Sequence, residues 1–403
     1  MTRAAAVITE RFFATCPRGL EALLADELRA LGAHDVDIAQ GGVGFAGEFS
    51  LCYRVNLHSR LASRVLWRVG GGPYADEDDI YQGTLSFDWP ALFDVQRTIM
   101  VRITAHKSPL RSLEFATLRI KDAVCDRFRE ACGERPSVDT REPQVRIYAW
   151  LTADTCTLYL DTSGASLFKR GLRKQAGLAP LNENLAAGML LLAGWRPGIP
   201  LFDPMCGSGT ILIEAALMAL RMAPGLRRSF GFEHLARFDV ALWQEIRQAA
   251  LDQCLPVTRQ PIYGRDLFGR SLDDARANLD AAGLAQVVEL KQGNVLEVPA
   301  PEAEGILVTN PPYGVRIGEQ AELEAFYPRL GDWLKRQCAG WTAYILSADM
   351  NLPKLIRLQA TRRIPLFNGG LECRLFEYRM VAGSARKKQA DDAGQAAEPG
   401  APG

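Results

Sequence analysis

The sequence predicts an α/β protein in which a doubly wound parallel sheet follows a smaller α+β region. Two observations carry this prediction. From Asn182 onward, helical segments alternate with short apolar runs of strand length, a pattern that places helices on both faces of a parallel sheet. Before that point, strands with alternating apolar residues, such as Val145 and Ile147, are interleaved with amphipathic helices.

Length and composition limit the class of protein. The chain has 403 residues and 48% hydrophobic residues, which indicates about two or three domains with enough apolar surface to bury. No apolar stretch reaches the roughly 18 residues of a spanning helix, and no long signal core opens the chain, so we expect a cytoplasmic protein without membrane contact. The nine cysteines lack close pairs or histidines at metal-ligand spacing, which favours a reducing compartment and no metal site.

The charge is uneven along the chain. The net charge is zero, which argues against a protein that binds polyanions over its whole surface. Between Arg97 and Lys174, however, fifteen Lys and Arg stand against nine Asp and Glu, an excess of six positive charges. We therefore expect a local basic surface in this part of the chain.

The elements of the N-terminal half form two successive α+β groups. The first group has strands at Phe12–Thr15 and Gly42–Phe49 on either side of a helix at Gly19–Leu31. The second group has strands at Ile99–Ala105, Gln144–Leu151 and Thr155–Asp161, with a helix at Ser112–Ala131.

The C-terminal half alternates regularly. We expect helices at Leu185–Ala193, Ile211–Arg221, Leu272–Ala281 and Leu323–Gln337. We expect strands at Pro200–Phe202, Pro261–Tyr263, Val287–Lys291, Ile306–Thr309 and Ala343–Leu346. The segment from Gly383 to Gly403 is rich in Ala, Gly, Pro and charge without apolar periodicity, so we expect it to be disordered.

A glycine-containing loop, Asp203–Thr210, follows the first strand of the expected sheet. Ligands of open α/β sheets bind beyond the carboxyl ends of the strands, where this loop would lie. Gly207 and Gly209 would let the backbone approach an adenosine-type cofactor, and Asp203 would bind an amino group better than a phosphate. The loop therefore favours S-adenosylmethionine over a dinucleotide, although a generic tight turn is the alternative interpretation.

The next two strands end in further polar residues. Asp266 follows the second strand, where a carboxylate can accept hydrogen bonds from vicinal ribose hydroxyls, or can be a solvated loop acid. Asn294 follows the third strand and could bind the adenine edge, because its amide offers both a donor and an acceptor. A simple Asx turn is the competing interpretation of Asn294.

The fourth strand leads into Asn310-Pro311-Pro312-Tyr313. An exocyclic amine on a heteroaromatic ring is a poor nucleophile, so an enzyme gains by orienting it toward the methyl donor. The side-chain oxygen of Asn310 and the carbonyl of Pro311 could accept its two N–H groups, while Tyr313 stacks on the base. Because bases in a duplex cannot reach such a pocket, the target must be single-stranded or flipped. A proline turn that closes a buried strand would explain only the prolines.

Together with these loops, the chain resembles the class I S-adenosylmethionine-dependent RNA methyltransferases that carry a THUMP domain. Among these it is most similar to the bacterial large-subunit (23S) ribosomal RNA guanine-N2 methyltransferases. The resemblance covers nearly the whole chain and rests on blocks in the same order. They are Phe168–Arg173, Ala179–Leu181, Leu185–Ala187, Gly194–Trp195, Leu212–Ala216, Ala223–Gly225, Trp243–Glu245 and Asn310–Gly314.

The resemblance implies a ferredoxin-like segment over residues 1–55, a THUMP RNA-binding domain over 56–165, a Rossmann-like methyltransferase domain over 166–382 and a disordered tail over 383–403. It implies that the site residues have three roles. Asp203, Gly207 and Gly209 would contact the cofactor, Asp266 its ribose and Asn294 its adenine, and Asn310, Pro311 and Tyr313 would bind the guanine amine. The family usually has an acidic residue at the adenine position, so Asn294 implies a weaker or differently oriented contact. Because the chain ends soon after Tyr378, we expect a single methyltransferase activity.

The expected activity is methyl transfer from S-adenosylmethionine to the N2 amine of a guanosine in ribosomal RNA. Basic residues expected to contact phosphates are Lys107, Arg119, Lys121, Lys169, Arg170, Arg173 and Lys174. The alternatives are a transfer RNA guanine-N2 methyltransferase, an adenine- or glutamine-directed methyltransferase, and a nonenzymatic RNA-binding or ribosome assembly factor. A nicotinamide dehydrogenase is disfavoured because the loop lacks Gly-x-Gly-x-x-Gly spacing.

Overall fold

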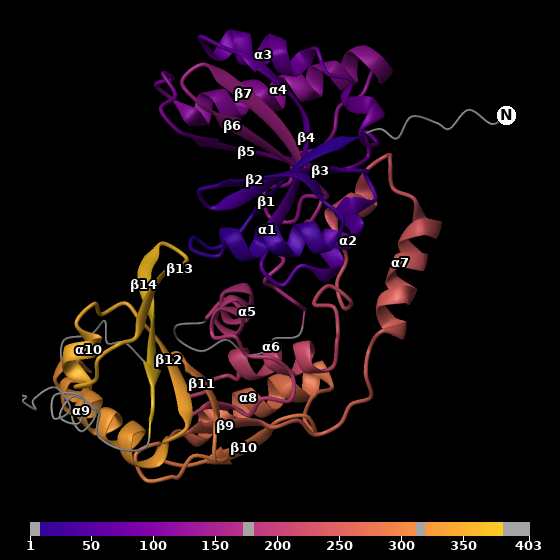
Figure 1. The fold of residues 1–403 in the computed structure, drawn as a ribbon. Coiled ribbons are helices and arrows are strands. Elements are labelled where there is room, and N and C mark those ends of the chain that lie inside the picture. Colours follow the sequence, from indigo (N-terminus) through magenta and orange to yellow (C-terminus); the bar gives the residue numbers. More distant parts are fainter. Residues whose placement is uncertain (1–8, 172–180, 312–318, 382–403) are drawn as a thin grey trace, which may run out of the picture. The chain divides into compact units, whose positions relative to one another are not determined.

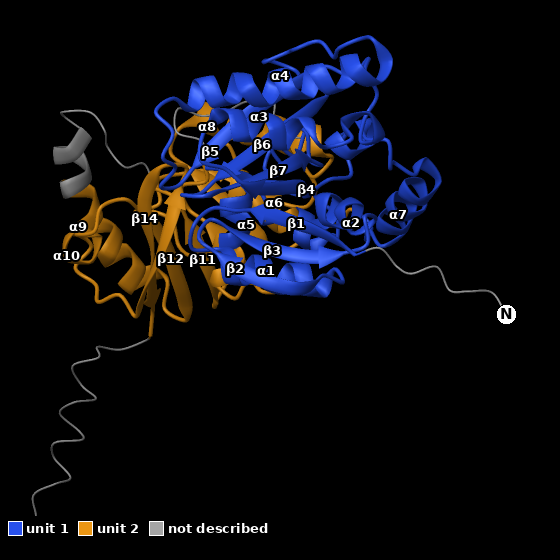
Figure 2. Ribbon diagram, turned by 90° about the horizontal axis from the view of Figure 1, so that it is seen from above, with its two compact units in different colours: residues 1–174, 181–188, 217–256 blue, residues 175–180, 189–216, 257–403 orange. Residues whose placement is uncertain are grey.

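The computed structural model describes residues 9–171, 181–311 and 319–381, and the side chains of residues 319–324 are not described. The chain divides into two compact units (Figure 2). Unit 1 contains residues 1–174, 181–188 and 217–256, and unit 2 contains residues 175–180, 189–216 and 257–403. Each unit is built on its own seven-stranded sheet.

Unit 1 is an α+β body whose sheet has the strand order β2-β3-β1-β4-β7-β6-β5 (Figure 1). Its strands are β1 (Glu10–Thr15), β2 (His34–Ala39), β3 (Gly42–Gly47), β4 (Arg64–Pro73), β5 (Ile99–Ala105), β6 (Val145–Leu151) and β7 (Thr155–Asp161). Its helices are α1 (Glu21–Ala30), α2 (Leu51–His58), α3 (Glu77–Leu85), α4 (Leu113–Cys132) and α7 (Val240–Asp252), with 3-10 turns η1 (Trp89–Ala91) and η2 (Gly231–His234). Strands β5 and β6 pair in parallel, and the other pairs are antiparallel.

Helix α4 shows how local sequence fixes an element. The side chain of Ser112 accepts a hydrogen bond from the Phe115 N–H and so caps the first turn. The helix ends at Cys132 and is followed by Gly133, whose φ of 78° is the left-handed conformation that favours glycine. Between these caps, Ala116, Ile120 and Val124 recur at helical spacing and are buried.

Residues 217–256 belong to unit 1 although the expected boundaries place them in the catalytic domain. Arg228 donates hydrogen bonds to the carbonyls of Ser163 (3.1 Å) and Ser166 (2.7 Å), which ties this segment to the chain after β7. Tyr53 of α2 packs on Phe232 with ring centroids 4.5 Å apart. These contacts give the segment an apolar and a polar attachment to unit 1.

Unit 2 contains a mostly parallel sheet with the strand order β10-β9-β8-β11-β12-β14-β13. Its strands are β8 (Leu201–Asp203), β9 (Ile262–Asp266), β10 (Glu289–Gln292), β11 (Gly305–Thr309), β12 (Trp341–Ser347), β13 (Arg362–Asn368) and β14 (Leu371–Arg379). Its helices are α8 (Gly269–Ala282), α9 (Glu319–Gln337) and α10 (Leu352–Leu355), and α5 (Glu183–Leu192) and α6 (Thr210–Ala219) contain residues of both units. In the described sheet only β14 runs against the other strands, because it pairs antiparallel with both β12 and β13.

The apolar core of unit 2 lies between the sheet and α9. Trp333 and Leu330 of α9 pack with Phe202, Leu307 and Trp341 from the strands, and all five are buried. The indole N–H of Trp333 donates to the carbonyl of Val298 (2.7 Å), so its polar atom is satisfied as well. This core fixes β8 and β11, the two strands that lead to the candidate site.

Candidate cofactor and substrate site

The site residues meet at one edge of the unit 2 sheet. Strands β8 and β11 are parallel neighbours, with Leu201 opposite Ile306 and Phe202 opposite Leu307. The strand order reverses at this pair, because β9 and β10 lie on one side of β8 whereas β12 lies beyond β11. The carboxyl ends at such a switch point form the ligand-binding crevice of open α/β sheets. The loops that begin after Asp203 and Thr309 therefore leave the sheet at that crevice.

Asp203 is the last residue of β8 and is 1% exposed. Its Oδ1 accepts hydrogen bonds from the Met205 N–H (3.2 Å) and from the Thr309 hydroxyl (2.8 Å), so its orientation is fixed from both strands. Burial, with Asp266 nearby as a smaller cause, raises the pKa of Asp203 to about 7. A cationic group placed beside Asp203 would reverse this shift, because it would favour the ionised carboxylate.

The loop after Asp203 has two glycines in left-handed backbone conformations, with φ of 52° at Gly207 and 82° at Gly209. A Cβ added at Gly209 would lie 3.3 Å from the Cβ of Ala275, so this glycine lets the loop approach α8. A Cβ added at Gly207 would meet no described atom within 4 Å, so this glycine faces open space. Cys206 in the same loop is buried, which raises the pKa of its thiol and disfavours a nucleophilic thiolate.

Asp266, the last residue of β9, holds this loop in place. Its Oδ2 accepts from the Gly207 N–H (2.9 Å) and its Oδ1 accepts from the Phe268 N–H (3.0 Å). Each carboxylate oxygen has a second lone pair, so Asp266 can still accept from two hydroxyl groups. The backbone carbonyl of Asp266 accepts from the Gly293 N–H (3.1 Å), which connects the loop after β10 to the same edge.

Asn294 forms an Asx turn. Its Oδ1 accepts from the Leu296 N–H (3.1 Å), and its Nδ2 donates to Oε1 of Glu297 (2.9 Å). The side chain of Asn294 is therefore hydrogen-bonded within its own loop. The Asx turn, which was the alternative to adenine binding, is present. A contact from Asn294 to adenine stays a prediction.

Asn310 directly follows Thr309, the residue that hydrogen-bonds Asp203. The Oδ1 atom of Asn310 is buried and accepts no hydrogen bond from the described part of the chain. A buried acceptor without a donor costs free energy, so such an atom is a position where a ligand N–H would be stabilising. Pro311 is buried beside it, whereas Pro312 and Tyr313 lie outside the described residues.

Two features of this edge of the sheet were not among the site residues expected from the sequence. Thr309 orients Asp203 through its hydroxyl, and a hydroxyl at the end of an otherwise aliphatic strand is the signal that could have identified it. Leu267 and Phe268 follow Asp266 and are 54% and 66% exposed. Exposed apolar side chains directly after the carboxylate that is expected to bind the ribose are suited to contact a flat purine ring.

The basic residues expected to bind RNA differ in their exposure and in their ion pairing. Lys107 and Lys169 are exposed. Arg119 is paired with Asp78 at 2.6 Å and Lys121 with Asp122 at 2.6 Å. In contrast, Arg170 is 2% exposed and donates to the carbonyls of Leu167 and Arg60, so its placement serves the fold of unit 1 rather than a surface contact. Arg173 and Lys174 lie outside the described residues.

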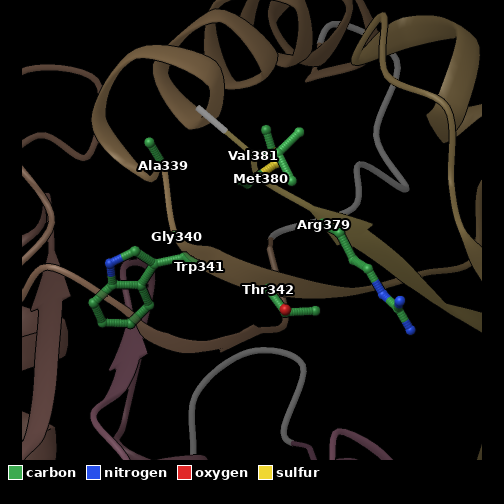
Figure 3. Close-up of a pocket in the computed structure, with 7 residues that line it drawn as sticks. All are labelled: Ala339, Gly340, Trp341, Thr342, Arg379, Met380 and Val381. Atoms are coloured by element: carbon green, nitrogen blue, oxygen red, sulfur yellow. The ribbon is translucent and has the colours of Figure 1, made fainter. Parts of the chain in front are cut away.

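A surface hollow of about 520 Å³ in unit 2 is separate from this site (Figure 3). It is lined by residues 339–342 and 379–381, which surround the first residue of β12. Trp341 at that end pairs with Gly305, the first residue of β11, whereas Asn310 follows the last. The hollow thus lies at the opposite edge of the sheet from Asp203 and Asn310.

Three further properties of the chain complete the description. Within residues 9–171, 181–311 and 319–381, no helix combines the length and the apolar character needed to cross a bilayer. Over the same ranges, no group of three or more His, Cys, Asp or Glu could hold a metal ion. All nine cysteines are free, and seven of them are buried.

Family models match three successive parts of the chain. The RlmL ferredoxin-like domain matches residues 11–66, and the THUMP domain matches residues 74–161. The RMKL-like methyltransferase domain matches residues 170–377, a little over half of the chain.

Individual relatives agree with these matches. Ribosomal RNA large subunit methyltransferase K/L of Shewanella sp. (strain W3-18-1) is 40% identical over 381 residues, which are 93% of this chain and 54% of the relative. The chain therefore spans about half the length of this relative. The "Putative RNA methyltransferase slr0064" of Synechocystis sp. is 38% identical over 380 residues, which are 94% of this chain and 99% of the relative. A crystal structure of SMU.472, "a putative methyltransferase complexed with SAH", is 31% identical with a TM-score of 0.85, and the match covers 93% of this chain and 99% of that one.

Proposed function

Since the chain belongs to the family of RMKL-like methyltransferases and has a THUMP domain, we propose that it methylates the exocyclic N2 amine of a guanosine in large-subunit (23S) ribosomal RNA, with S-adenosylmethionine as the methyl donor. That the protein is a methyltransferase that uses S-adenosylmethionine follows from the family. The target base, the methylated atom and the RNA are what we propose.

The residues at the β8 and β9 ends fit S-adenosylmethionine. Asp203 is a buried carboxylate without a cationic partner among the described residues, which suits the amino group of the methionine moiety. Gly207 faces open space at the crevice, so it leaves room for the cofactor. Asp266 has acceptor capacity for the two ribose hydroxyls. S-adenosylmethionine supplies an electrophilic methyl group on a positively charged sulfur.

The proposal that an amine accepts the methyl group rests on one observation. The buried Oδ1 of Asn310 has no hydrogen-bond donor among the described residues. A hydrogen bond from one N–H of a base amine would satisfy this oxygen, and the Pro311 carbonyl is the candidate acceptor for the other. Two such bonds hold the amine plane, so that the nitrogen lone pair faces the methyl donor when Asp203 and Gly207 hold the cofactor. No strong base is required before transfer, because the neutral NH2 nitrogen attacks the methyl carbon, the bond from that carbon to sulfur breaks to release S-adenosylhomocysteine, and the extra proton on nitrogen then passes to water.

The choice of ribosomal RNA rests on relatives and on unit 1. The Shewanella relative is named for large-subunit ribosomal RNA, and the Synechocystis relative, which the chain covers almost completely, for RNA. The THUMP match over residues 74–161 supplies a second domain in addition to the catalytic domain. A base in a helix is shielded by stacking, so the target guanosine must be unpaired or flipped to reach Asn310.

The direct test is Asn310→Ala in a single-turnover assay with saturating S-adenosylmethionine and RNA, with the nucleosides analysed by mass spectrometry. The wild-type protein is expected to form N2-methylguanosine, and the variant to be slower by on the order of a hundredfold because the amine is no longer oriented. Asn351→Ala is the matched control, since Asn351 is an exposed asparagine whose side chain caps no helix. If Asn310→Ala keeps near-normal turnover while it still binds RNA, the proposed mechanism is wrong.

A further inference from the structure

The sheet of unit 1 has one face packed against helices and another that carries aromatic and cationic side chains. Ile147, Ala149 and Leu158 are buried on the first face of β6 and β7. Helix α3 packs on β4 and α4 packs on β5, and both lie along one side of these strands (Figure 1). Because side chains alternate along a strand, the residues between the buried ones point to the opposite face.

Strand register aligns four of these outward residues in one row across four neighbouring strands. Arg102 of β5 is opposite Tyr148 of β6, Tyr148 is opposite Tyr159 of β7, and Tyr159 is opposite Arg68 of β4. Two tyrosines are thus flanked by two arginines, whose backbones are about 14 Å apart over three strand spacings.

The row continues into a larger surface along β6. Trp150 is two residues beyond Tyr148 on the same face, between Thr104 and Thr157, and is 42% exposed. Arg146 is two residues before Tyr148. We call this surface the arginine–aromatic face, and it consists of Arg68, Arg102, Arg146, Tyr148, Trp150 and Tyr159.

The charge of the arginine–aromatic face is positive. Arg68 and Arg102 are exposed and Arg146 is half-buried, and the described residues offer none of them an ion pair or a side-chain hydrogen bond. Asp161 is the one acid at the outward positions of β4 to β7 in the described chain, and it is 3% exposed and paired with Arg64. Arg64 neutralises Asp161 through this ion pair, and its guanidinium lies 5.7 Å from the centre of the Tyr148 ring, at the border of the face.

We propose that the arginine–aromatic face binds a single-stranded segment of the RNA substrate, with bases stacked on Trp150 and the tyrosines and with phosphates beside the arginines. This inference rests on the proposed function and adds a binding surface to it. The exposed Trp150 ring and the half-buried rings of Tyr148 and Tyr159, beside cations, match the two chemical parts of an unpaired nucleotide, a flat base and a negative phosphate. A duplex fits less well, because its bases are stacked on each other and offer no free ring face.

The face is distinct from most of the basic residues that the sequence suggested. Arg119 and Lys121 lie on α4, which packs on the opposite face of the sheet. The exposed Lys107 follows the end of β5, where Ala105 pairs with Leu151, the neighbour of Trp150. Lys107 therefore extends the positive charge at the Trp150 end of the face.

The test compares Trp150→Ala and Arg102→Ala in binding to a fluorescent single-stranded RNA of twelve nucleotides and to a duplex of the same length, by anisotropy at several salt concentrations. Trp150→Ala is expected to weaken single-strand binding roughly five- to a hundredfold at every salt concentration, since it removes a stacking contact. Arg102→Ala is expected to lower the slope of log K against log salt by about 0.7, since it removes one phosphate contact. Val240→Ala, at an exposed apolar residue of α7, and Arg363→Ala, at an exposed arginine of β13, are controls that should bind like the wild type.

Each result decides for or against the face. If Trp150→Ala binds single strands like Val240→Ala, or weakens duplex binding equally, the inference is wrong. If Trp150→Ala instead changes the sedimentation of the free protein, the face is an interface between copies of the chain. Failure of the proposed function is distinguishable, because Asn310→Ala should lose methyl transfer yet bind the twelve-nucleotide RNA normally.

Discussion

The titration of Asp203 gives a quantitative prediction for cofactor binding. Burial raises its pKa to about 7 in the free protein, so about half of the molecules carry a protonated Asp203 at pH 7. Only the carboxylate attracts the amino group of S-adenosylmethionine, so the apparent dissociation constant is multiplied by one plus the ratio of protonated to ionised Asp203. That factor is about 11 at pH 6 and about 2 at pH 7, so we expect about fivefold tighter binding at pH 7 than at pH 6.

Isothermal titration calorimetry measures this effect in two ways. The dissociation constant should follow the stated factor, and titrations at pH 7 in buffers of different ionisation enthalpy should show release of about half a proton per cofactor bound. Asp203→Asn keeps a side-chain oxygen for Met205 and Thr309 but cannot ionise. This variant should bind the cofactor on the order of tenfold or more weakly, with no proton release from this position. A wild-type affinity that is the same at pH 6 and pH 7 would refute the assigned role of Asp203.

The same group links pH to the stability of the free protein. The folded pKa of Asp203 is raised above its unfolded value of about 3.9, so the folded state binds the proton more tightly. The contribution to the free energy of unfolding is therefore present at low pH and is lost as the pH rises from about 4 to about 7. Relative to Asp203→Asn, the wild-type protein should lose thermal stability across this window, and a gain would contradict the sign.

The remaining predictions concern the loop after Asp203 and the carboxylate of Asp266. Gly207→Ala should destabilise the protein by about 1 kcal/mol or more because its φ of 52° disfavours a side chain, and it should also weaken cofactor binding because the new methyl group enters the crevice. Gly194→Ala has a similar φ of 69° and equally open surroundings away from the site, so calorimetry should show unchanged cofactor affinity there. Asp266→Ala should leave the Gly207 and Phe268 N–H groups without their acceptor, lower stability by about 1–3 kcal/mol in denaturant unfolding and reduce the thermal shift produced by the cofactor. Equal cofactor affinity of Gly207→Ala and Gly194→Ala, or a normal thermal shift for Asp266→Ala, would contradict the site.

The sequence predicted the strands whose limits are marked by strong local signals. The expected bounds of β5 and β7 agree with the structure, because each is a run of alternating residues between turn formers. The long strand β4 was not expected, since Gly70-Gly71-Gly72 has no strand propensity and is held by its ladder with β7. The edge strand β13 was not expected either, because it contains Pro365, which only an edge position tolerates.

The candidate site was predictable to the extent that topology determines it. Once β8, β9 and β11 are parallel, their terminal residues must share an edge, so Asp203 and Asp266 could be grouped from the sequence alone. The hydroxyl of Thr309 at the end of an aliphatic strand marks it as a candidate, but its partner Asp203 could not be predicted, because the hydrogen bond depends on the register of two strands separated by about a hundred residues. The arginine–aromatic face depends on register across four strands and was hidden for the same reason.

The central claim is that Asn310 presents a base amine to the methyl group of S-adenosylmethionine. The most direct measurement is a reaction of the purified protein with cofactor that carries a deuterated methyl group and with total RNA from cells that lack the protein, followed by nucleoside mass spectrometry and mapping of the label. We predict that the label appears as N2-methylguanosine at a position in large-subunit ribosomal RNA and is absent with Asn310→Ala. Label on an adenosine, on a ribose hydroxyl or on protein, or undiminished labelling by Asn310→Ala, would contradict the account.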